Sequence, residues 1–388
     1  MKKIHSLCIV CLSFIATTLE AQEGKSNLNP IAVGVPSLTI APDARGGAMG
    51  DVGVATSPDM ASQYWNAAKT PFAWSKAGIQ LSYTPWLRKL VSDIDLAYLS
   101  GYYKLGSNDN QAIGASVRYF SLGDVLLQET KEDAGITISP YEMAIDVSYS
   151  VKLTENFSGA VAFRYIRSDL GGGIVEGTNA GNAYAADISG YYNKYIVTGN
   201  SECLLGLGFN ISNIGTKISY DFQNTTNFLP TNLRLGASYL FPLDDYNSLS
   251  LNLDLNKYLV PTRPDTREMD PDAKSAAEDK YRNISSIAGI FKSFTDAPGG
   301  FKEEFQEIMW SGGAEYAYDN KFFIRGGYFY EHPNKGNRQY FSLGAGFKMN
   351  VLQLDVAYLM ATAASNPLDQ TLRFSLTFDM DGLKGLMR

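Results

Sequence analysis

The segment Leu372-Arg373-Phe374-Ser375-Leu376-Thr377-Phe378-Asp379 alternates between apolar and polar side chains without a break. Successive side chains of a β-strand point to opposite faces, so this segment predicts a strand with one apolar and one polar face. A soluble barrel with an apolar interior would show the same alternation. A strand that crosses a membrane needs about 9–11 residues, so the number, length and connections of the strands distinguish the two architectures.

Similar segments occur along the chain from residue 77 onward. A face that carries Asp254, Arg164 and Arg118 is a poor protein core, but it suits the wall of a polar lumen. The fourteen expected strands are Gly78–Trp86, Ile94–Lys104, Ala112–Phe120, Met143–Leu153, Phe157–Arg167, Ala183–Tyr195, Cys203–Ile214, Leu233–Phe241, Leu249–Leu259, Ile308–Tyr318, Phe322–Glu331, Tyr340–Met349, Leu352–Met360 and Leu372–Met380.

The connections between these segments alternate in length. Short turns such as Thr154–Asn156 and Asp319–Lys321 alternate with long segments such as Ser121–Tyr141 and Val260–Glu307, although Leu87–Ser92 is short where a long loop is expected. Short periplasmic turns and long external loops are typical of bacterial outer-membrane barrels. We therefore predict an all-β fold, a 14-stranded antiparallel transmembrane β-barrel over residues 77–388, in the outer membrane of a Gram-negative cell.

The N-terminus predicts a secretory signal peptide over residues 1–21. Lys2 and Lys3 precede an apolar stretch, and Leu19-Glu20-Ala21 is a plausible cleavage site. Downstream of it the chain has one cysteine, Cys203, and no run of about 18 apolar residues that could form a transmembrane helix. The 33 basic and 40 acidic residues form no basic stripe, which argues against nucleic acid as a partner.

Two segments lie outside the strand pattern. Residues 22–76 are rich in Gly, Ala and Pro, and we expect them to fill the barrel as an N-terminal plug. Buried charges need partners, so Arg45 or Asp51 is expected to meet a lumen charge such as Asp254 or Arg164. The other segment is the external loop 260–307, in which apolar residues from Tyr281 to Phe294 recur at helical spacing up to Pro298-Gly299-Gly300.

Apolar side chains in the external loops are candidates for binding a partner. The alternative is that each loop packs over its own barrel mouth, and for loop 260–307 this is a helix that caps the barrel. The candidate partner-binding residues are Leu126, Leu127, Ile136, Phe222, Phe228, Ile287, Ile290, Phe291 and Phe294.

The segment from Ala44-Arg45-Gly46-Gly47-Ala48-Met49-Gly50-Asp51 to Ala61-Ser62-Gln63-Tyr64-Trp65-Asn66-Ala67-Ala68 is the most specific part of the sequence. It resembles the N-terminal signature of the PorV/PorQ group, which is itself similar to the FadL transporters of long-chain fatty acids. Those families usually have Asn-Pro-Ala where this chain has Asn66-Ala67-Ala68, and the departure removes a rigid turn. The resemblance extends over the whole chain.

This resemblance implies protein handling by the type IX secretion system. Members of the group are expected to receive cargo with a C-terminal signal domain from the translocon. They pass it to the sortase PorU, acting with PorQ and PorZ, which links cargo to lipopolysaccharide at the outer membrane. No cofactor and no metal are expected.

Two other functions remain open. A FadL-like transporter would carry a hydrophobic small molecule through the barrel and would need a continuous apolar tunnel. A lipid A deacylase would need a catalytic histidine, and the only histidine after the signal peptide is His332, next to Pro333 in an external loop. We favour a solvated loop histidine for that residue, and the residue counts nearly exclude catalytic triads and multi-histidine metal sites.

Overall fold

The computed structural model describes residues 28–380 except 89–90, 92, 129–134, 172, 175–176, 200, 222–224, 265, 267–268 and 363–368. The predicted signal peptide (residues 1–21) and the candidate residue Phe222 lie outside the described residues.

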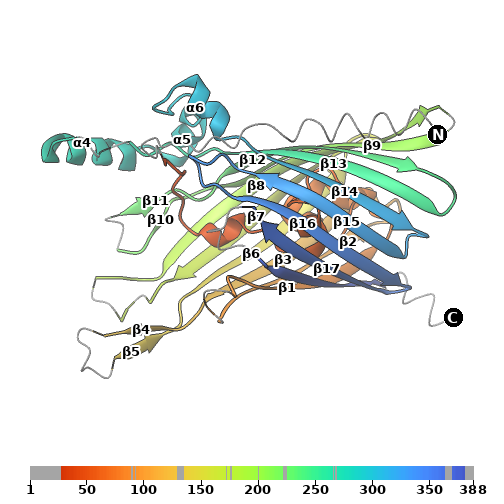
Figure 1. Ribbon diagram of the computed structural model, residues 1–388, viewed down its shortest axis with the longest axis horizontal. Coiled ribbons are helices and arrows are strands. Elements are labelled where there is room, and N and C mark those ends of the chain that lie inside the picture. The colour runs from red at the N-terminus through yellow and green to blue at the C-terminus, as the bar shows by residue number, and fades with distance from the viewer. Residues whose placement is uncertain are drawn as a thin grey trace.

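Fourteen antiparallel strands close into a barrel, in which each strand pairs with its neighbours in chain order and β1 pairs with β18 (Figure 1). This confirms the predicted fold, and the strand ends lie within a few residues of the expected ones. The barrel strands are β1 (Ala77–Pro85), β2 (Ile94–Leu105), β3 (Gln111–Leu122), β6 (Tyr141–Lys152), β7 (Phe157–Asp169), β8 (Gly181–Thr198), β9 (Ser201–Gly215), β12 (Asn232–Pro242), β13 (Asn247–Tyr258), β14 (Met309–Tyr318), β15 (Phe322–Tyr330), β16 (Gln339–Met349), β17 (Leu352–Ala361) and β18 (Leu372–Asp379).

The alternation of the sequence sets the register at the barrel closure. Leu81 of β1 lies opposite Leu376 of β18, and both side chains point outward. The neighbouring pair, Ser82 and Ser375, points inward, and their hydroxyl oxygens lie 2.8 Å apart in a hydrogen bond. A shift of one residue would reverse both faces, so the pattern fixes the pairing.

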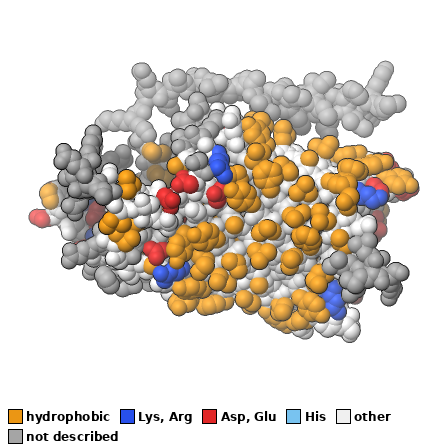
Figure 2. Space-filling view, turned by 90° about the horizontal axis from the view of Figure 1, so that it is seen from below, with side chains coloured by type: hydrophobic (Ala, Val, Ile, Leu, Met, Phe, Trp, Pro, Cys, Tyr) orange, Lys and Arg blue, Asp and Glu red, His pale blue; other side chains and the backbone are white. Residues whose placement is uncertain are grey.

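The outer wall of the barrel is apolar. Phe163, Ile324 and Leu343 point outward and are 60%, 65% and 55% exposed. Figure 2 shows hydrophobic side chains spread along the visible face of the wall between the two ends, with few charged side chains among them. Outward aromatic side chains gather near both ends, as in membrane barrels with interfacial girdles. They include Tyr119, Tyr165, Trp310 and Tyr330 near one end and Tyr103, Tyr239, Tyr318 and Phe322 near the other.

None of the described helices has both the length and the apolar character needed to cross a membrane.

The inner wall is polar, as the sequence predicts. Asp146, Arg164, Arg118 and Asp254 alternate with the outward apolar residues of their strands, and each is buried inside the barrel. An interior of this kind needs water or polar partners to satisfy it. The N-terminal segment supplies many of these partners, as described below.

The long connections lie at one end of the barrel, which we call the loop end, and the short ones at the opposite turn end (Figure 1). Two small hairpins extend from the loop end, and three helices lie between β13 and β14. These elements are β4 (Val125–Leu127) with β5 (Ile136–Ile138), β10 (Ile218–Ser219) with β11 (Thr226–Asn227), α4 (Pro271–Arg282), α5 (Ser286–Lys292) and α6 (Phe301–Gln306). In bacterial barrels such long connections are extracellular.

The prediction of one helix through Tyr281 and Phe294 is wrong in detail. The helix breaks after Arg282, and Ser285 begins a new one by accepting a hydrogen bond from the backbone N–H of Ala288 at 3.2 Å. A serine side chain satisfies a free N–H at a helix start, so this position favours a new N-terminus over continuation.

The N-terminal segment, residues 28–76, contains four short helices: η1 (Pro36–Thr39), α2 (Ala44–Ala48), α3 (Ser62–Trp65) and η2 (Ala67–Phe72). Figure 1 shows the helices of this segment within the barrel. The segment begins at the loop end, where the N–H of Asn29 donates to the carbonyl oxygen of Asn334 at 2.8 Å. It ends at the turn end, where Lys104 N–H donates to the carbonyl oxygen of Lys76 at 2.7 Å. The described chain therefore runs through the barrel before the first strand begins.

Candidate functional site

Arg45 of α2 links the N-terminal segment to the barrel wall. Its guanidinium lies 2.8 Å from the carboxylate of Glu315 on β14 and 2.8 Å from that of Asp59. Glu315 also pairs with Arg325 of β15 at 2.6 Å, and Arg325 pairs with Asp355 of β17 at 2.7 Å. Arg325 is among the largest fully buried side chains, so its charge depends on these carboxylates.

Asp51 forms a second link, with the nearby strands β16 and β18. One carboxylate oxygen lies 2.5 Å from Nη1 of Arg373 on β18, and the other accepts a hydrogen bond from the hydroxyl of Tyr340 on β16 at 2.5 Å. The predicted partners, Asp254 and Arg164, are wrong for both Arg45 and Asp51. The sequence pattern placed Glu315 and Arg373 at inward positions but carried no information about which charge each would meet.

Asp254 and Arg164 have other partners. One carboxylate oxygen of Asp254 accepts hydrogen bonds from the N–H groups of Gly53 at 2.8 Å and Val54 at 3.0 Å. Arg164 pairs with Asp187 at 2.9 Å and Asp146 at 3.3 Å. The second lumen cation, Arg118, donates to the carbonyl oxygen of Ile40. Backbone groups of the N-terminal segment therefore bind Asp254 and Arg118, whereas Arg164 forms ion pairs with carboxylates of the barrel wall.

The glycines of the N-terminal motif permit close packing against the strands. Gly50 has φ +76°, and a Cβ atom there would lie 2.6 Å from the carbonyl oxygen of Tyr328. On the facing strand, a Cβ atom at Gly327 would lie 2.1 Å from the carbonyl carbon of Met49. A side chain at either position would push the segment away from the wall.

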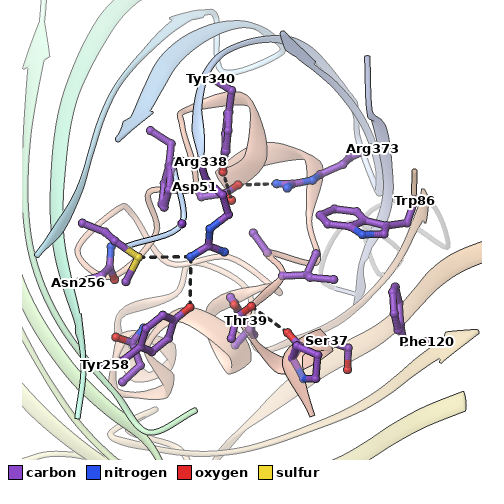
Figure 3. A pocket seen from close by; sticks show the side chains of 18 of the residues that line it. Ser37, Thr39, Asp51, Trp86, Phe120, Asn256, Tyr258, Arg338, Tyr340 and Arg373 are labelled. Atoms are coloured by element: carbon purple, nitrogen blue, oxygen red, sulfur yellow. Dashed lines mark hydrogen bonds and ion pairs between the residues drawn. The ribbon is translucent and has the colours of Figure 1, made fainter. Parts of the chain in front are cut away.

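A cavity of about 490 Å³ lies between the N-terminal segment and the loop end of the barrel (Figure 3). Its walls combine aromatic side chains, such as Trp86 and Phe120, with polar ones, such as Thr39 and Asn256. Arg338 also lines it and pairs with Glu331 at 2.8 Å, so this cation is already neutralised. The cavity is large enough for a small amphipathic molecule.

The loop end carries exposed apolar side chains on two separate elements. Ile287 and Phe291, one turn apart on α5, are 66% and 72% exposed, whereas Ile290 is half-buried. Leu126 and Ile136 on the hairpin β4–β5 are 54% and 57% exposed. We call Ile287, Phe291, Leu126 and Ile136 the loop-end apolar surface. Leu127, on the same hairpin, is half-buried.

Two of the candidate loop residues lie elsewhere. Phe228 is only 5% exposed because Tyr281 of α4 packs edge-on against its ring, with centroids 5.6 Å apart. Its side chain therefore holds loops together and forms no part of an exposed surface. Phe294 lies in a groove beside the outer wall of the barrel, together with Leu235 and Leu255.

The sequence reasoning missed Phe301 and Phe305 of α6, which are 78% and 59% exposed. Their spacing of four residues, directly after Pro298-Gly299-Gly300, was the available signal for a further short helix with an aromatic face.

His332 lies in a turn between β15 and β16. Its Nδ1 accepts a hydrogen bond from the backbone N–H of Asn334 at 3.1 Å. Burial and the nearby charge of Lys335 lower the pKa of this imidazole. The ring therefore helps to hold a turn, which favours the interpretation as a loop histidine over the catalytic one.

The loop between β13 and β14 contains a carboxyl group, that of Asp296, whose protonation changes near neutral pH. Oδ2 of Asp296 accepts a hydrogen bond from the N–H of Thr262 at 3.1 Å, while burial and the carboxylates of Glu304 and Glu307 raise the pKa of Asp296 to about 6. Because this value lies above the ordinary 3.8, the stabilising contribution of protonated Asp296 is complete below about pH 4 and is lost as the pH rises through about 6.

We therefore expect hydrogen-exchange protection of this loop, corrected for the intrinsic exchange rate, to fall between pH 5 and pH 7. Asp296→Asn should remove the pH dependence, whereas Asp272→Asn, on the exposed face of α4, should retain it. Equal protection at both pH values in the unmodified protein would contradict this assignment.

Comparison with known proteins gives one family match. A family model described as "Type IX secretion system protein PorV" matches residues 22–265, more than half of the chain. No curated protein sequence matches significantly.

Several solved structures align with most of this chain, with TM-scores below 0.5. The toluene transporter TbuX of Ralstonia pickettii is 12% identical, with a TM-score of 0.44 over 87% of this chain and 96% of that chain. A structure of the toluene transporter TodX of Pseudomonas putida is 10% identical, with a TM-score of 0.47 over 88% of this chain and 98% of that one. A FadL homologue of Pseudomonas aeruginosa is 11% identical, with a TM-score of 0.45 over 90% and 99%. At these identities the similarity says nothing about what this chain binds.

The family match covers both the N-terminal segment and the first nine barrel strands. The closed barrel of fourteen strands with an apolar outer wall is the form of an outer-membrane protein. The chain belongs to the PorV family and is an outer-membrane component of the type IX secretion system.

Proposed function

We propose that this protein binds the C-terminal signal domain of secreted cargo at its loop end. In this proposal it receives cargo from the translocon and delivers it to an attachment complex that contains the sortase PorU with PorQ and PorZ. The protein acts as a carrier without catalysis of its own. Family membership supports a role in secretion, and the loop-end apolar surface is the observation that carries the binding proposal.

The interior of the barrel supports a carrier of proteins over a channel for solutes. Ion pairs from Arg45 and Asp51 tie the N-terminal segment to β14 and β18, and lumen charges on other strands bind its backbone. We propose that residues 22–76 act as a plug that keeps the barrel closed. Cargo would then be held outside the barrel, on the loops.

Site-specific photocrosslinking tests the binding site. A photoreactive residue at Phe291 or at Leu126, introduced singly in living cells, is expected to crosslink to cargo through its C-terminal signal domain. The matched control position is Ala276 on α4, which is exposed but lies outside the loop-end apolar surface. Crosslinks to cargo at Ala276 as strong as those at Phe291 and Leu126 would contradict the proposed site.

A second function is supported by the cavity of about 490 Å³. Its wall includes Trp86, Leu87 and Phe120 at the loop ends of β1 and β3, so it could hold a hydrophobic small molecule. Native mass spectrometry of the purified protein tests this function. A retained apolar molecule that Thr39→Trp displaces would favour transport or storage of that molecule over a purely protein-handling role.

A further inference from the structure

A second apolar site lies outside the barrel, beneath α6. A groove of about 260 Å³ is lined on one side by Leu233, Leu235 and Leu255 and on the other by Phe294 and the aromatic residues of α6. The leucines point outward from β12 and β13, the same face that contacts lipid along the rest of these strands. The floor of the groove is therefore a continuation of the lipid-facing wall.

Charged residues hold α6 in place over this wall. Lys257 at the end of β13 lies 3.0 Å from Glu304 and 2.5 Å from Glu307, and Lys335 lies 2.6 Å from Glu303 and 3.0 Å from Glu307. Both lysines are buried, so α6 is fixed to the barrel rim by its acidic face.

The face of α6 that lines the groove is apolar. Phe301 and Phe305 pack edge-on against each other, with ring centroids 4.8 Å apart, and remain largely exposed. A fixed helix with one charged face on the barrel rim and one exposed aromatic face beside the lipid-facing wall is suited to the boundary between lipid and water.

The level of the groove along the barrel also matches that boundary. Leu255 lies opposite Trp310 of β14, whose ring stacks on Tyr330 with centroids 5.4 Å apart. Both rings point outward and belong to the aromatic girdle at the loop end. Such girdles lie at the interface of the membrane, so the groove opens at the depth where lipid acyl chains begin.

We propose that this groove binds one acyl chain of a bilayer lipid from the outer leaflet. The chain would lie on Leu235 and Leu255 and be covered by Phe294, Phe301 and Phe305. The binding site rests on the position of the barrel in the outer membrane and is independent of the proposed cargo function. It assigns α6 to lipid contact and leaves Ile287 and Phe291 of α5 for other partners.

Photolabelling tests the proposal in proteoliposomes of phosphatidylcholine that contain a phospholipid with a diazirine on one acyl chain. The full-length protein is irradiated, and labelled peptides are identified by mass spectrometry. We expect strong labelling of residues 294–308, above that of the girdle strands β7 and β8. Leu255→Trp should fill the groove and abolish this excess, because the larger ring occupies the place of the chain.

Leu253→Trp is the matched control. Leu253 lies on the same strand and the same outward face, two residues from Leu255, but does not line the groove. The proposal is overturned if residues 294–308 are labelled no more than the girdle, or if both tryptophan variants reduce labelling equally. It is also overturned if photoreactive residues at Phe301 and Phe305 crosslink only to protein in native membranes.

Discussion

Replacement of both Ile287 and Phe291 by aspartate is expected to abolish stable cargo binding while the barrel remains folded and inserted. Burying each apolar side chain against a partner contributes about 1.5–3 kcal/mol, so losing both weakens binding by roughly two to four orders of magnitude. The barrel should be unaffected because both side chains are largely exposed on α5, which is no part of the strand ladder. Co-purification of cargo and cargo attachment at the cell surface are the measurements.

The matched control places two aspartates on the neighbouring helix, as Ala273→Asp with Ala276→Asp. It makes the same change in charge on exposed positions of α4, outside the loop-end apolar surface. If both double variants bind and attach cargo normally, the loop that contains α5 is a lid, and the cargo site must be sought on the hairpin β4–β5.

Glu315→Ala should destabilise the folded barrel strongly. The substitution leaves the buried cations of Arg45 and Arg325 with only Asp59 and Asp355 to neutralise them. Removing one partner of a buried ion pair typically costs about 3–5 kcal/mol, and here two buried cations each lose one of their two carboxylate partners. Urea unfolding in lipid vesicles, followed by the gel mobility of the folded form, measures this loss.

The exposed ion pair at the turn between β14 and β15 provides the control. Asp319 lies 2.5 Å from Lys321, but both side chains are largely exposed. Asp319→Ala should therefore change the free energy of unfolding by no more than about 1 kcal/mol. Equal losses in the two variants would show that burial of the Arg45–Glu315–Arg325 cluster adds nothing to stability.

The strands of this protein could be predicted from the sequence because their signal is local. Each barrel strand needs one face for lipid and one for the lumen, and the pleat converts that need into a period of two residues. The segment Leu249–Leu259 shows it plainly, and the observed strand β13 differs from it by two residues at its start and one at its end. The alternation of short and long connections, a separate signal, predicted which end of the barrel carries the long loops.

The candidate site was predicted only in part. Helical spacing named Ile287 and Phe291 as candidates, but their exposure could not be read from it. Burial of Phe228 depended on Tyr281, 53 positions later in the chain. Composition shows that a loop contains apolar residues, but which of them remain exposed depends on what packs against them.

The sequence by itself therefore determined the barrel and which face of each strand points outward. Only the tertiary structure decided that Arg45 meets Glu315, that Asp51 meets Arg373, and that α6 covers a groove on the outer wall. The physical reason is that the alternation of a strand is local information, whereas the ion-pair partner of a buried charge is not. Alternation between two environments is repeated within each strand. The choice among several inward charges, however, depends on the three-dimensional path of a segment hundreds of residues away.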